Sequence, residues 1–192
     1  MNGASAARRI VGFGLVHAFV LMATGVGIAH AQPPAPPEVP GMFNAVDFNF
    51  VGQANLGAPF QVDSGRIAEA KSPSAAIRSY AHLMVASHKP VVDALNAILQ
   101  RKNVTPSNPL LHGAYDAMLF TLYAEHGAAF DQTYTKGQVE YQKGNAALFQ
   151  QEIQNGSDPD LREFARQTLP KIEDHLQRAL KLAGTASVDS TD

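Results

Sequence analysis

Residues 75–102 read AAIRSYAHLMVASHKPVVDALNAILQRK and decide the fold class of this chain. Apolar side chains recur in this stretch every three or four positions, which is the spacing of one helix face. Ser72 and Pro73 precede it as a helix-start signal, because Ser caps helices and Pro fits the first helical position. The apolar positions are Ile77, Ala81, Met84, Val91, Leu95 and Ile98. The stretch therefore predicts one long amphipathic helix with a face that must be buried.

Comparable signals predict helices before and after this stretch. We expect a first helix over 44–70, bent or broken at residues 57–59, where the sequence is Gly-Ala-Pro. A shorter helix should cover about 110–125 and end near Gly127, a residue type that often follows helix ends. Two more helices are expected, over about 131–155 and from residue 159 onward. The residues expected to cap the last three helices are Asn108, Asp131 and Asp158.

The chain lacks the alternation of apolar and polar residues that is typical of strands. The sequence therefore predicts an all-α fold with four main helices and one additional short helix. Because amphipathic helices bury their apolar faces against one another, the expected architecture is an antiparallel four-helix bundle. Pro90 and Pro170 lie inside two of these helices and should free the backbone carbonyls of Ala86 and Arg166.

The composition limits the classes of function. The 192 residues are 45% apolar and 17% charged, with a formal net charge of −2. Since there is no basic run, binding of nucleic acid through a basic surface is not expected. The chain contains no Cys, which excludes disulfides, thiolate metal sites, a Cys nucleophile and lipid attachment through Cys.

The N-terminus has the pattern of an export signal. Residues 1–10 contain two Arg and no acid, an apolar stretch follows to residue 28, and residues 29–31 supply a small-x-small site. We expect a signal peptide over residues 1–31 that directs the protein to a bacterial periplasm, by the general or the twin-arginine route. An uncleaved membrane anchor is the alternative, although the Gly residues of the apolar stretch weaken it as a spanning helix.

Composition also divides the rest of the chain. Residues 32–42 include QPPAPPEVP and are expected to form a Pro-rich linker that cannot build a core. The helical bundle should cover residues 43–183. The small polar residues 184–192 are expected to form a disordered tail. After residue 31 we expect no transmembrane segment, because no apolar run is long enough to cross a membrane.

Two histidines occupy core-facing positions. His88 continues the apolar face of the helix over 75–102, and His175 lies on the apolar face of the last helix. A buried imidazole needs partners for its ring nitrogens, and metals commonly supply one. One interpretation is a metal or cofactor site between helices, with a divalent transition metal as the candidate cofactor. The other is two core histidines that hydrogen-bond to Tyr80 or Tyr141, or to carbonyls freed by proline.

The ligand spacing of di-iron bundles is missing from the sequence. Those proteins use Glu-x-x-His on one helix face, but Val85 stands three residues before His88 and Ile172 three before His175. Phosphate-binding Gly loops, G-x-S-x-G and H-E-x-x-H are missing as well. We therefore expect a protein that is not an enzyme, with a hydrolase or another enzyme whose site is not recognised as the alternative.

Four motifs stand in a specific order and spacing: MVASH at 84–88, FDQTY at 130–134, DPDLREFA at 158–165 and LPKIEDHL at 169–176. Together they resemble the bacterial family called domain of unknown function 4142. The resemblance covers about residues 45–182. It implies a ferritin-like helical bundle in an exported protein.

The resemblance also concerns the candidate site. His88 and His175 match histidines of the family. Gln61 stands where the family usually has an acid, and Gln142 stands where it usually has His. If these four positions form a family metal site, the resemblance implies that two of its ligands are amides in this chain.

Two functions follow from the sequence as hypotheses. The first is a non-enzymatic periplasmic bundle that acts in envelope maintenance or as an interaction module, with an envelope protein or a second copy of the chain as partner. The second is a ferritin-like metal-binding or redox protein that uses His88 and His175, with Gln61 and Gln142 as neighbours.

Overall fold

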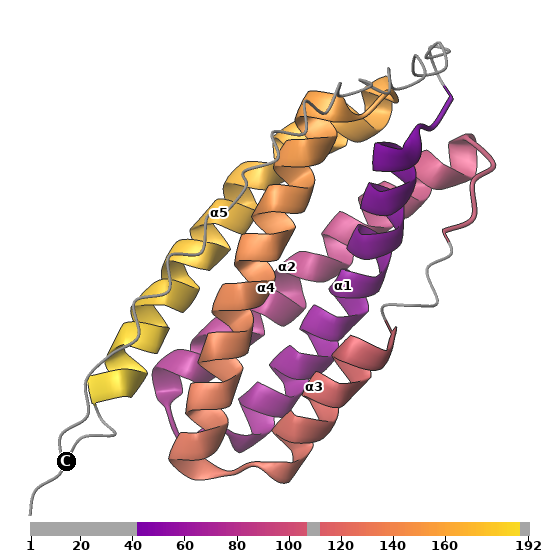
Figure 1. The fold of residues 1–192 in the computed structure, drawn as a ribbon. Coiled ribbons are helices and arrows are strands. Elements are labelled where there is room, and N and C mark those ends of the chain that lie inside the picture. Colours follow the sequence, from indigo (N-terminus) through magenta and orange to yellow (C-terminus); the bar gives the residue numbers. More distant parts are fainter. Residues whose placement is uncertain (1–41, 107–111, 189–192) are drawn as a thin grey trace, which may run out of the picture. The chain divides into compact units, whose positions relative to one another are not determined.

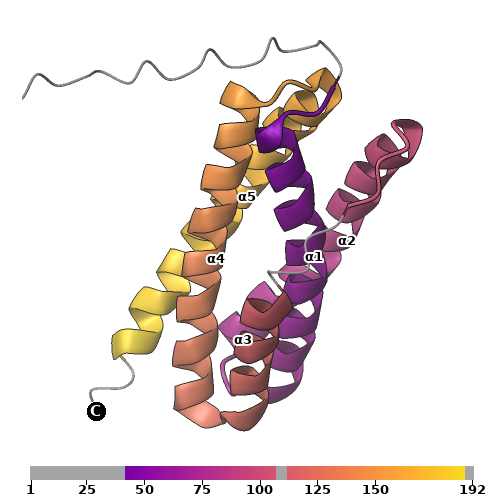
Figure 2. The ribbon, with the colours of Figure 1, turned by 45° about the vertical axis from the view of Figure 1, so that its right-hand side comes forward.

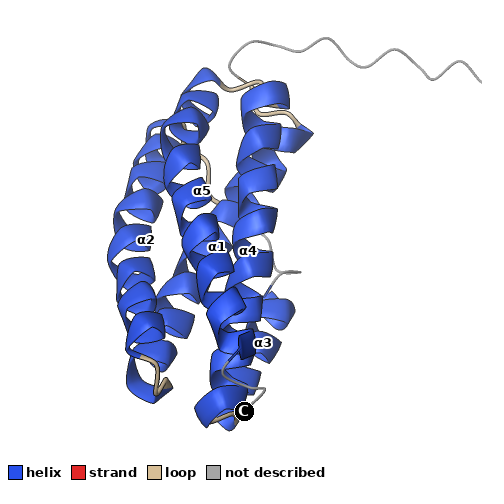
Figure 3. Ribbon diagram, turned by 90° about the vertical axis from the view of Figure 1, so that its left-hand side faces the viewer, coloured by secondary structure: helices blue, strands red, loops and turns tan. Residues whose placement is uncertain are grey.

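The computed structural model describes residues 42–106 and 112–188. Five helices and no strand occur in these two ranges (Figure 1, Figure 3). They are α1 (Ala45–Lys71), α2 (Ala75–Arg101), α3 (His112–Ala124), α4 (Gly127–Asn155) and α5 (Pro159–Val188). The prediction of an all-α fold with four long helices and a short one is confirmed. The predicted signal peptide 1–31, the linker up to residue 41 and the expected cap Asn108 lie outside the described residues.

The four long helices form two antiparallel pairs (Figure 1, Figure 2). Residues 72–74 join α1 to α2, and residues 156–158 join α4 to α5. The pairs meet through α1 and α4 and through α2 and α5, and α3 lies beside α1 and α4. Ring contacts mark where the pairs meet, between Phe50 and Phe149 at 4.8 Å and between Phe60 and Tyr141 at 5.6 Å, centroid to centroid. The apolar face of each long helix is thereby covered by the other helices.

The core consists of two apolar clusters. One contains the rings of Phe50, Phe149 and Phe164, with centroids 4.8 to 6.1 Å apart. The other includes Phe130 and Tyr134, whose rings stack with centroids 6.1 Å apart. Truncating one of the buried Phe rings to Ala would cost about 3–5 kcal/mol, because packed helices close such a space only in part. These clusters keep the helices at fixed separations.

Two helix starts differ from the predictions. α2 begins at Ala75 with Ser74 as its N-cap, so Ser72 is not the cap. α4 begins at Gly127, so the predicted cap Asp131 lies inside the helix. Neither residue caps a helix because the two side chains bond to each other. The Ser72 hydroxyl donates a hydrogen bond to the Asp131 carboxylate at 2.6 Å. Gly127 has φ 59°, a left-handed conformation that favours glycine, and the chain turns from α3 into α4 there.

The proline residues do not interrupt the helices. Pro59, Pro90 and Pro170 all lie inside continuous helices, so of the predicted bend or break at residues 57–59 the break does not occur. α5 also runs on to Val188, past the predicted end of the bundle at residue 183. A Gly inside a helix costs about 1 kcal/mol, and Gly184 is therefore too weak a signal to end this one. Residues 189–192 of the predicted tail lie outside the described residues.

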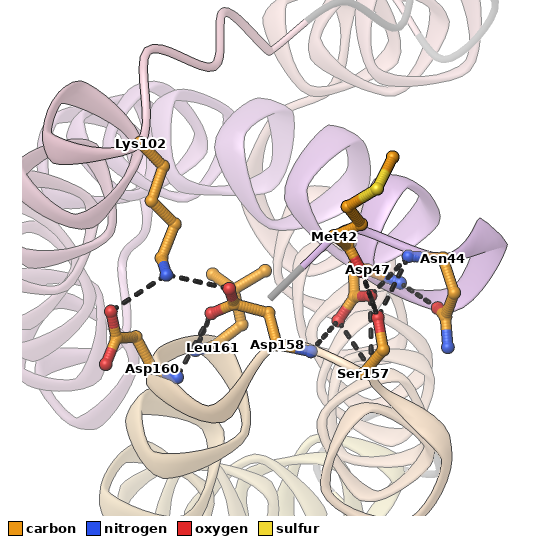
Figure 4. Close-up of polar contacts among 8 residues, drawn as sticks. All are labelled: Met42, Asn44, Asp47, Lys102, Ser157, Asp158, Asp160 and Leu161. Atoms are coloured by element: carbon orange, nitrogen blue, oxygen red, sulfur yellow. Dashed lines mark hydrogen bonds and ion pairs between the residues drawn. The ribbon is translucent and has the colours of Figure 1, made fainter. Parts of the chain in front are cut away.

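A cluster of hydrogen bonds ties the start of α1 to the start of α5 (Figure 4). The Asp47 carboxylate accepts from the backbone N–H of Asn44 at 2.6 Å, and the Asn44 side chain accepts from the backbone N–H of Asp47 at 3.0 Å, which together form a capping box. The same carboxylate accepts from the backbone N–H groups of Ser157 and Asp158 at 3.1 Å each. We call these four residues the Asp47 clasp.

Lys102 connects the clasp to the end of α2 (Figure 4). One oxygen of Asp158 accepts from the backbone N–H groups of Asp160 and Leu161 at 3.0 Å each, which confirms the predicted cap of the last helix. The other oxygen pairs with the Lys102 ammonium at 2.7 Å, and Lys102 also pairs with Asp160 at 2.9 Å. Since the Asp158 side chain is fully buried, loss of Lys102 would leave a charge without its partner.

Glu152 is a buried acid beside the clasp. Its side chain is fully buried, and this burial, with a smaller effect from the charge of Asp47, raises the pKa of its carboxyl to about 8. An exposed Glu of the unfolded chain ionises near pH 4.5. The folded protein therefore keeps Glu152 protonated at neutral pH, where the unfolded chain does not.

This difference predicts that rising pH weakens the fold through Glu152. The stabilising effect of the protonated carboxyl is fully present below pH 4.5 and is lost as pH rises to about 8, because only the unfolded chain releases the proton in this window. Urea unfolding at pH 5 to 9 should show Glu152→Gln gaining stability over the native chain as pH rises, by a few kcal/mol in total. Parallel pH profiles for the two proteins would contradict the prediction.

Candidate functional site

A layer of four polar side chains crosses the core, one from each long helix. They are Gln61 of α1, His88 of α2, Gln142 of α4 and His175 of α5, and their exposed fractions are 0, 6, 0 and 3%. On every long helix, the polar residue lies in sequence between residues of the two apolar clusters. Both histidines are thus buried, as the apolar faces of their helices predicted. These four are also the positions at which the sequence placed a candidate site.

The two imidazole rings lie next to each other. Their centroids are 5.6 Å apart and the ring planes meet at 33°. Nδ1 of His88 lies 2.9 Å from the backbone carbonyl oxygen of Met84. Because a carbonyl can only accept, we infer that Nδ1 carries the hydrogen and that Nε2 keeps its lone pair. Metal-binding histidines are commonly oriented by such a bond from the other ring nitrogen.

Both imidazoles are neutral at pH 7. Burial lowers the pKa of His88, and burial lowers the pKa of His175 to about 4. The positive charge of Lys171 acts in the same direction on both rings. Nδ1 of His175 has no hydrogen-bond partner among the described residues. The pair therefore presents unprotonated nitrogen atoms in the interior, in the form that binds metal ions.

The two glutamines are also incompletely hydrogen-bonded. The Gln142 amide N–H donates to the sulfur atom of Met84 at 3.4 Å, while its oxygen has no partner in the described part of the chain. Neither amide atom of Gln61 has one. A buried polar group without a partner costs about 1–3 kcal/mol. A native core keeps few such groups, so this layer marks a place where a ligand or ordered water would be stabilised.

Two glycines of α1 bring Gln61 into this layer. Gly57 lies against Tyr141 of α4, where a Cβ atom would come within 2.3 Å of the tyrosine oxygen. Gly65 lies against Val85 of α2, where a Cβ atom would come within 2.8 Å of a methyl group. Gln61 stands one helical turn from each glycine. It therefore enters the core where α1 is closest to both α2 and α4.

A small cavity lies at the histidine pair. Its volume is about 20 Å³, enough for one water molecule or one ion, and both His88 and His175 line it. Outward it opens into a cleft, and the space including that open to solvent is about 420 Å³. Ser87, Thr168 and Lys171 supply polar groups to the walls. The pair is therefore buried, but the cleft gives small molecules a route to it.

The residues around this cavity decide which ligands it suits. In residues 42–106 and 112–188, no group of three or more His, Asp or Glu side chains is arranged to hold a metal ion. An ion at the pair would take two imidazoles from the protein. Gln61 and Gln142 do not line this cavity, so the other ligands would be water or a small molecule, and the donor set differs from that of carboxylate-rich di-iron bundles.

The predicted alternative partners of the histidines are not used. The Tyr80 hydroxyl lies 3.4 Å from the Gln138 side chain and 3.4 Å from the backbone carbonyl of His175, and does not bond to an imidazole. His88 bonds to the carbonyl of Met84, and not to that of Ala86. Lys171 was missed by the sequence analysis, although it stands four residues before His175 and so shares its helix face.

The chain resembles known proteins in family and in fold. A family model described as "Domain of unknown function (DUF4142)" matches residues 32–182. A solved structure, "Crystal structure of DUF305 fragment from Deinococcus radiodurans", aligns with a TM-score of 0.66 at 15% sequence identity, over 74% of this chain and 98% of that chain. At this identity the likeness concerns the fold alone. A comparison with curated proteins gives no significant match.

Because its amide atoms have no partner among the described residues, we predict that Gln61 lowers the stability of the folded protein. Replacing it with Met, which has a similar shape, removes two unpartnered polar atoms and should stabilise the metal-free protein by about 1–3 kcal/mol in urea unfolding. Gln53→Met is the matched control, since Gln53 bonds to Asn49 near the surface and should change stability by less than about 0.5 kcal/mol. A destabilised Gln61→Met variant would mean that the amide has a partner in solution.

Acid should weaken the fold through His175. Its pKa is about 4 in the folded protein and 6.5 in the unfolded chain, so the neutral ring stabilises fully above pH 6.5 and this effect is lost as pH falls to 4. His175→Gln, which cannot take up the proton, should lose less stability than the native chain between pH 6.5 and 4. Thermal unfolding of both proteins at matched pH values measures the difference, and an equal loss would contradict the depressed pKa.

Proposed function

Since the family match covers most of its length, the chain belongs to the DUF4142 family, and we propose that it is an exported helical-bundle protein that binds one transition-metal ion between His88 and His175. The observation that carries this proposal is a pair of buried, neutral imidazoles from two helices, 5.6 Å apart, beside a cavity that can hold one ion. A metal ion about 2 Å from one nitrogen of each ring can link two imidazoles whose centroids are this far apart, because each nitrogen lies about 1 Å nearer the ion than its ring centroid.

The proposed location is the periplasm. Support comes from the N-terminal pattern of two Arg, an apolar stretch and a small-residue site over residues 1–31. In the described part of the chain, no helix is long and apolar enough to cross a membrane. An exported protein that binds metal would act as a buffer or carrier for an ion in the cell envelope.

The donor atoms indicate which metals would bind. Imidazole suits zinc, copper, iron and nickel, whereas magnesium and calcium prefer carboxylate and carbonyl oxygen atoms. Gln61 and Gln142 leave the layer without a carboxylate. We therefore propose a zinc or copper ion. In architecture the protein would be ferritin-like, with one residue from each long helix in the layer, but its ligand chemistry would differ from that of an iron centre.

The non-enzymatic interaction module is the second candidate, and one observation favours it. Phe120 and Tyr123 lie one turn apart on α3, with exposed fractions of 75 and 65%. Exposed aromatic side chains are common at protein interfaces. An envelope protein or a second copy of the chain would be the partner, and the histidine pair would then serve only the packing of the core.

Metal titration separates the two candidates. The purified protein should bind about one equivalent of Zn²⁺ in calorimetry, and free zinc at 100 times its Kd should stabilise the fold by about 2.7 kcal/mol. His88→Leu and His175→Leu should each abolish this binding. Both are expected to fold, because an apolar side chain replaces a buried polar one.

His82→Ala is the matched control for these variants. His82 lies on the same helix as His88, but its side chain is 78% exposed and pairs with Glu69 at 2.8 Å. This variant should bind zinc like the native chain. If Zn²⁺, Cu²⁺ and Ni²⁺ all leave the melting temperature of the native protein unchanged, the metal proposal is wrong and the interaction module is favoured.

A further inference from the structure

Glu152 of α4 is an acid without a hydrogen-bond donor at the Asp47 clasp. The side chains of Glu152, Asp47 and Asp158 are all fully buried. No N–H or O–H group of the residues that the structure describes donates to either carboxyl oxygen of Glu152. The group within its hydrogen-bonding reach is the Asp47 carboxyl. Gly156 covers Glu152 from the loop between α4 and α5, where a Cβ atom would collide with the carboxyl group.

Two carboxyl groups can share a hydrogen bond only when one of them is protonated. Asp47 is the ionised member of the pair, because its surroundings consist of donors (Figure 4). It accepts from the backbone N–H groups of Asn44, Ser157 and Asp158, and from the Ser157 hydroxyl at 2.5 Å. Such bonds favour a carboxylate over a carboxylic acid. The proton therefore resides on Glu152, whose O–H group donates to Asp47.

The charged groups that act on Glu152 come from α1, from the loop before α5 and from α5 itself. They are Asp47, Asp158 and Arg162 respectively. Burial, followed by the negative charge of Asp47, raises the pKa of the Glu152 carboxyl to about 8, and the positive charge of Arg162 opposes this shift. Lys102, at the end of α2, pairs with Asp158 at 2.7 Å. Ionisation of Glu152 would thus place a second buried negative charge beside Asp47.

We propose that Glu152 and Asp47 form a proton-controlled latch, which holds the start of α1 on the loop between α4 and α5 while Glu152 is protonated and releases it when Glu152 ionises. The proton passes to solvent, and the two carboxylates then separate. This inference goes beyond the proposed function and does not depend on the histidine pair.

The release is local, because the clasp ties only the first turn of α1. The next turn is held by Phe50, whose ring contacts those of Phe149 and Phe164 with centroids 4.8 and 6.1 Å away. These contacts contain no titratable group. The ends of elements generally open at a lower free energy than the core does. The start of α1 can therefore leave the loop while the bundle stays folded.

The direction of the pH effect follows from the proton that is released. In the closed latch the pKa of Glu152 is about 8, and in the opened form it returns to the ordinary value of 4.5. Opening therefore releases one proton between these two pH values. The equilibrium constant for opening should rise about tenfold per pH unit within this window and level off above it.

Hydrogen exchange of single backbone amides, measured by NMR, tests the latch. The amides of Ser157 and Asp158 donate to Asp47 across the clasp and report its opening directly. After correction for the intrinsic pH dependence of exchange, their protection factors should fall about tenfold per unit from about pH 5.5 to 7.5. The amide of Tyr134, in the second apolar cluster, should remain better protected than both at every pH.

Two Glu→Gln variants of α4 complete the experiment. Glu152→Gln keeps a donor towards Asp47 but has no proton to lose, so protection of the Ser157 and Asp158 amides should not change with pH in this window. Glu140→Gln is the matched control, because Glu140 is 67% exposed and pairs with Lys143 at 3.3 Å. It should follow the native chain.

Two results would overturn the proposal. If protection of the Ser157 and Asp158 amides is independent of pH in the native chain, or falls equally in Glu152→Gln, the latch is wrong. If these amides open with the same free energy as the amide of Tyr134 at every pH, the whole fold opens and the local release is wrong. Neither result bears on zinc binding at the histidine pair.

Discussion

The burial of polar atoms is the constraint on which the interior of this bundle depends. Two apolar clusters hold the helices together, and the buried polar side chains of Gln61, His88, Gln142 and His175 lie in sequence between residues of these clusters. Removing His175 and Gln61 from water is unfavourable unless a partner replaces the lost hydrogen bonds. Three atoms of these two side chains have none among the described residues. The buried polar atoms of this layer therefore lower the free energy of unfolding, as the residues of functional sites commonly do.

The geometry of this layer depends on contacts outside it. The Asp47 clasp fixes α1 against the loop between α4 and α5, and Lys102 fixes the end of α2 to the same loop. These contacts disfavour sliding of α1 and α2 along α4 and α5. Gly57 and Gly65 then allow α1 to approach its neighbours closely enough for Gln61 to reach the layer.

Sequence periodicity was sufficient for the fold class and for the two histidines, because a helix face repeats every 3.6 residues and the positions of His88 and His175 follow from it. The sequence did not reveal the roles of Ser72 and Asp131. A residue that caps a helix and one that bonds to a distant side chain look alike in sequence. The raised pKa of Glu152 was equally out of reach, because its main cause is burial in the folded protein, with a smaller effect from Asp47 on another helix. Helical spacing alone places Lys171, one turn before His175, on the same helix face. The sequence could therefore have identified it as a charged neighbour of the candidate site.

The clasp also has a consequence for the order in which the chain can fold. Within each antiparallel pair the contacting residues are close in sequence, whereas Asp47 and Ser157 are 110 positions apart. Local contacts form at a lower entropic cost than distant ones. During synthesis α1 can therefore pair with α2 early, whereas the clasp at the start of α1 cannot form until residues 157 and 158 have left the ribosome.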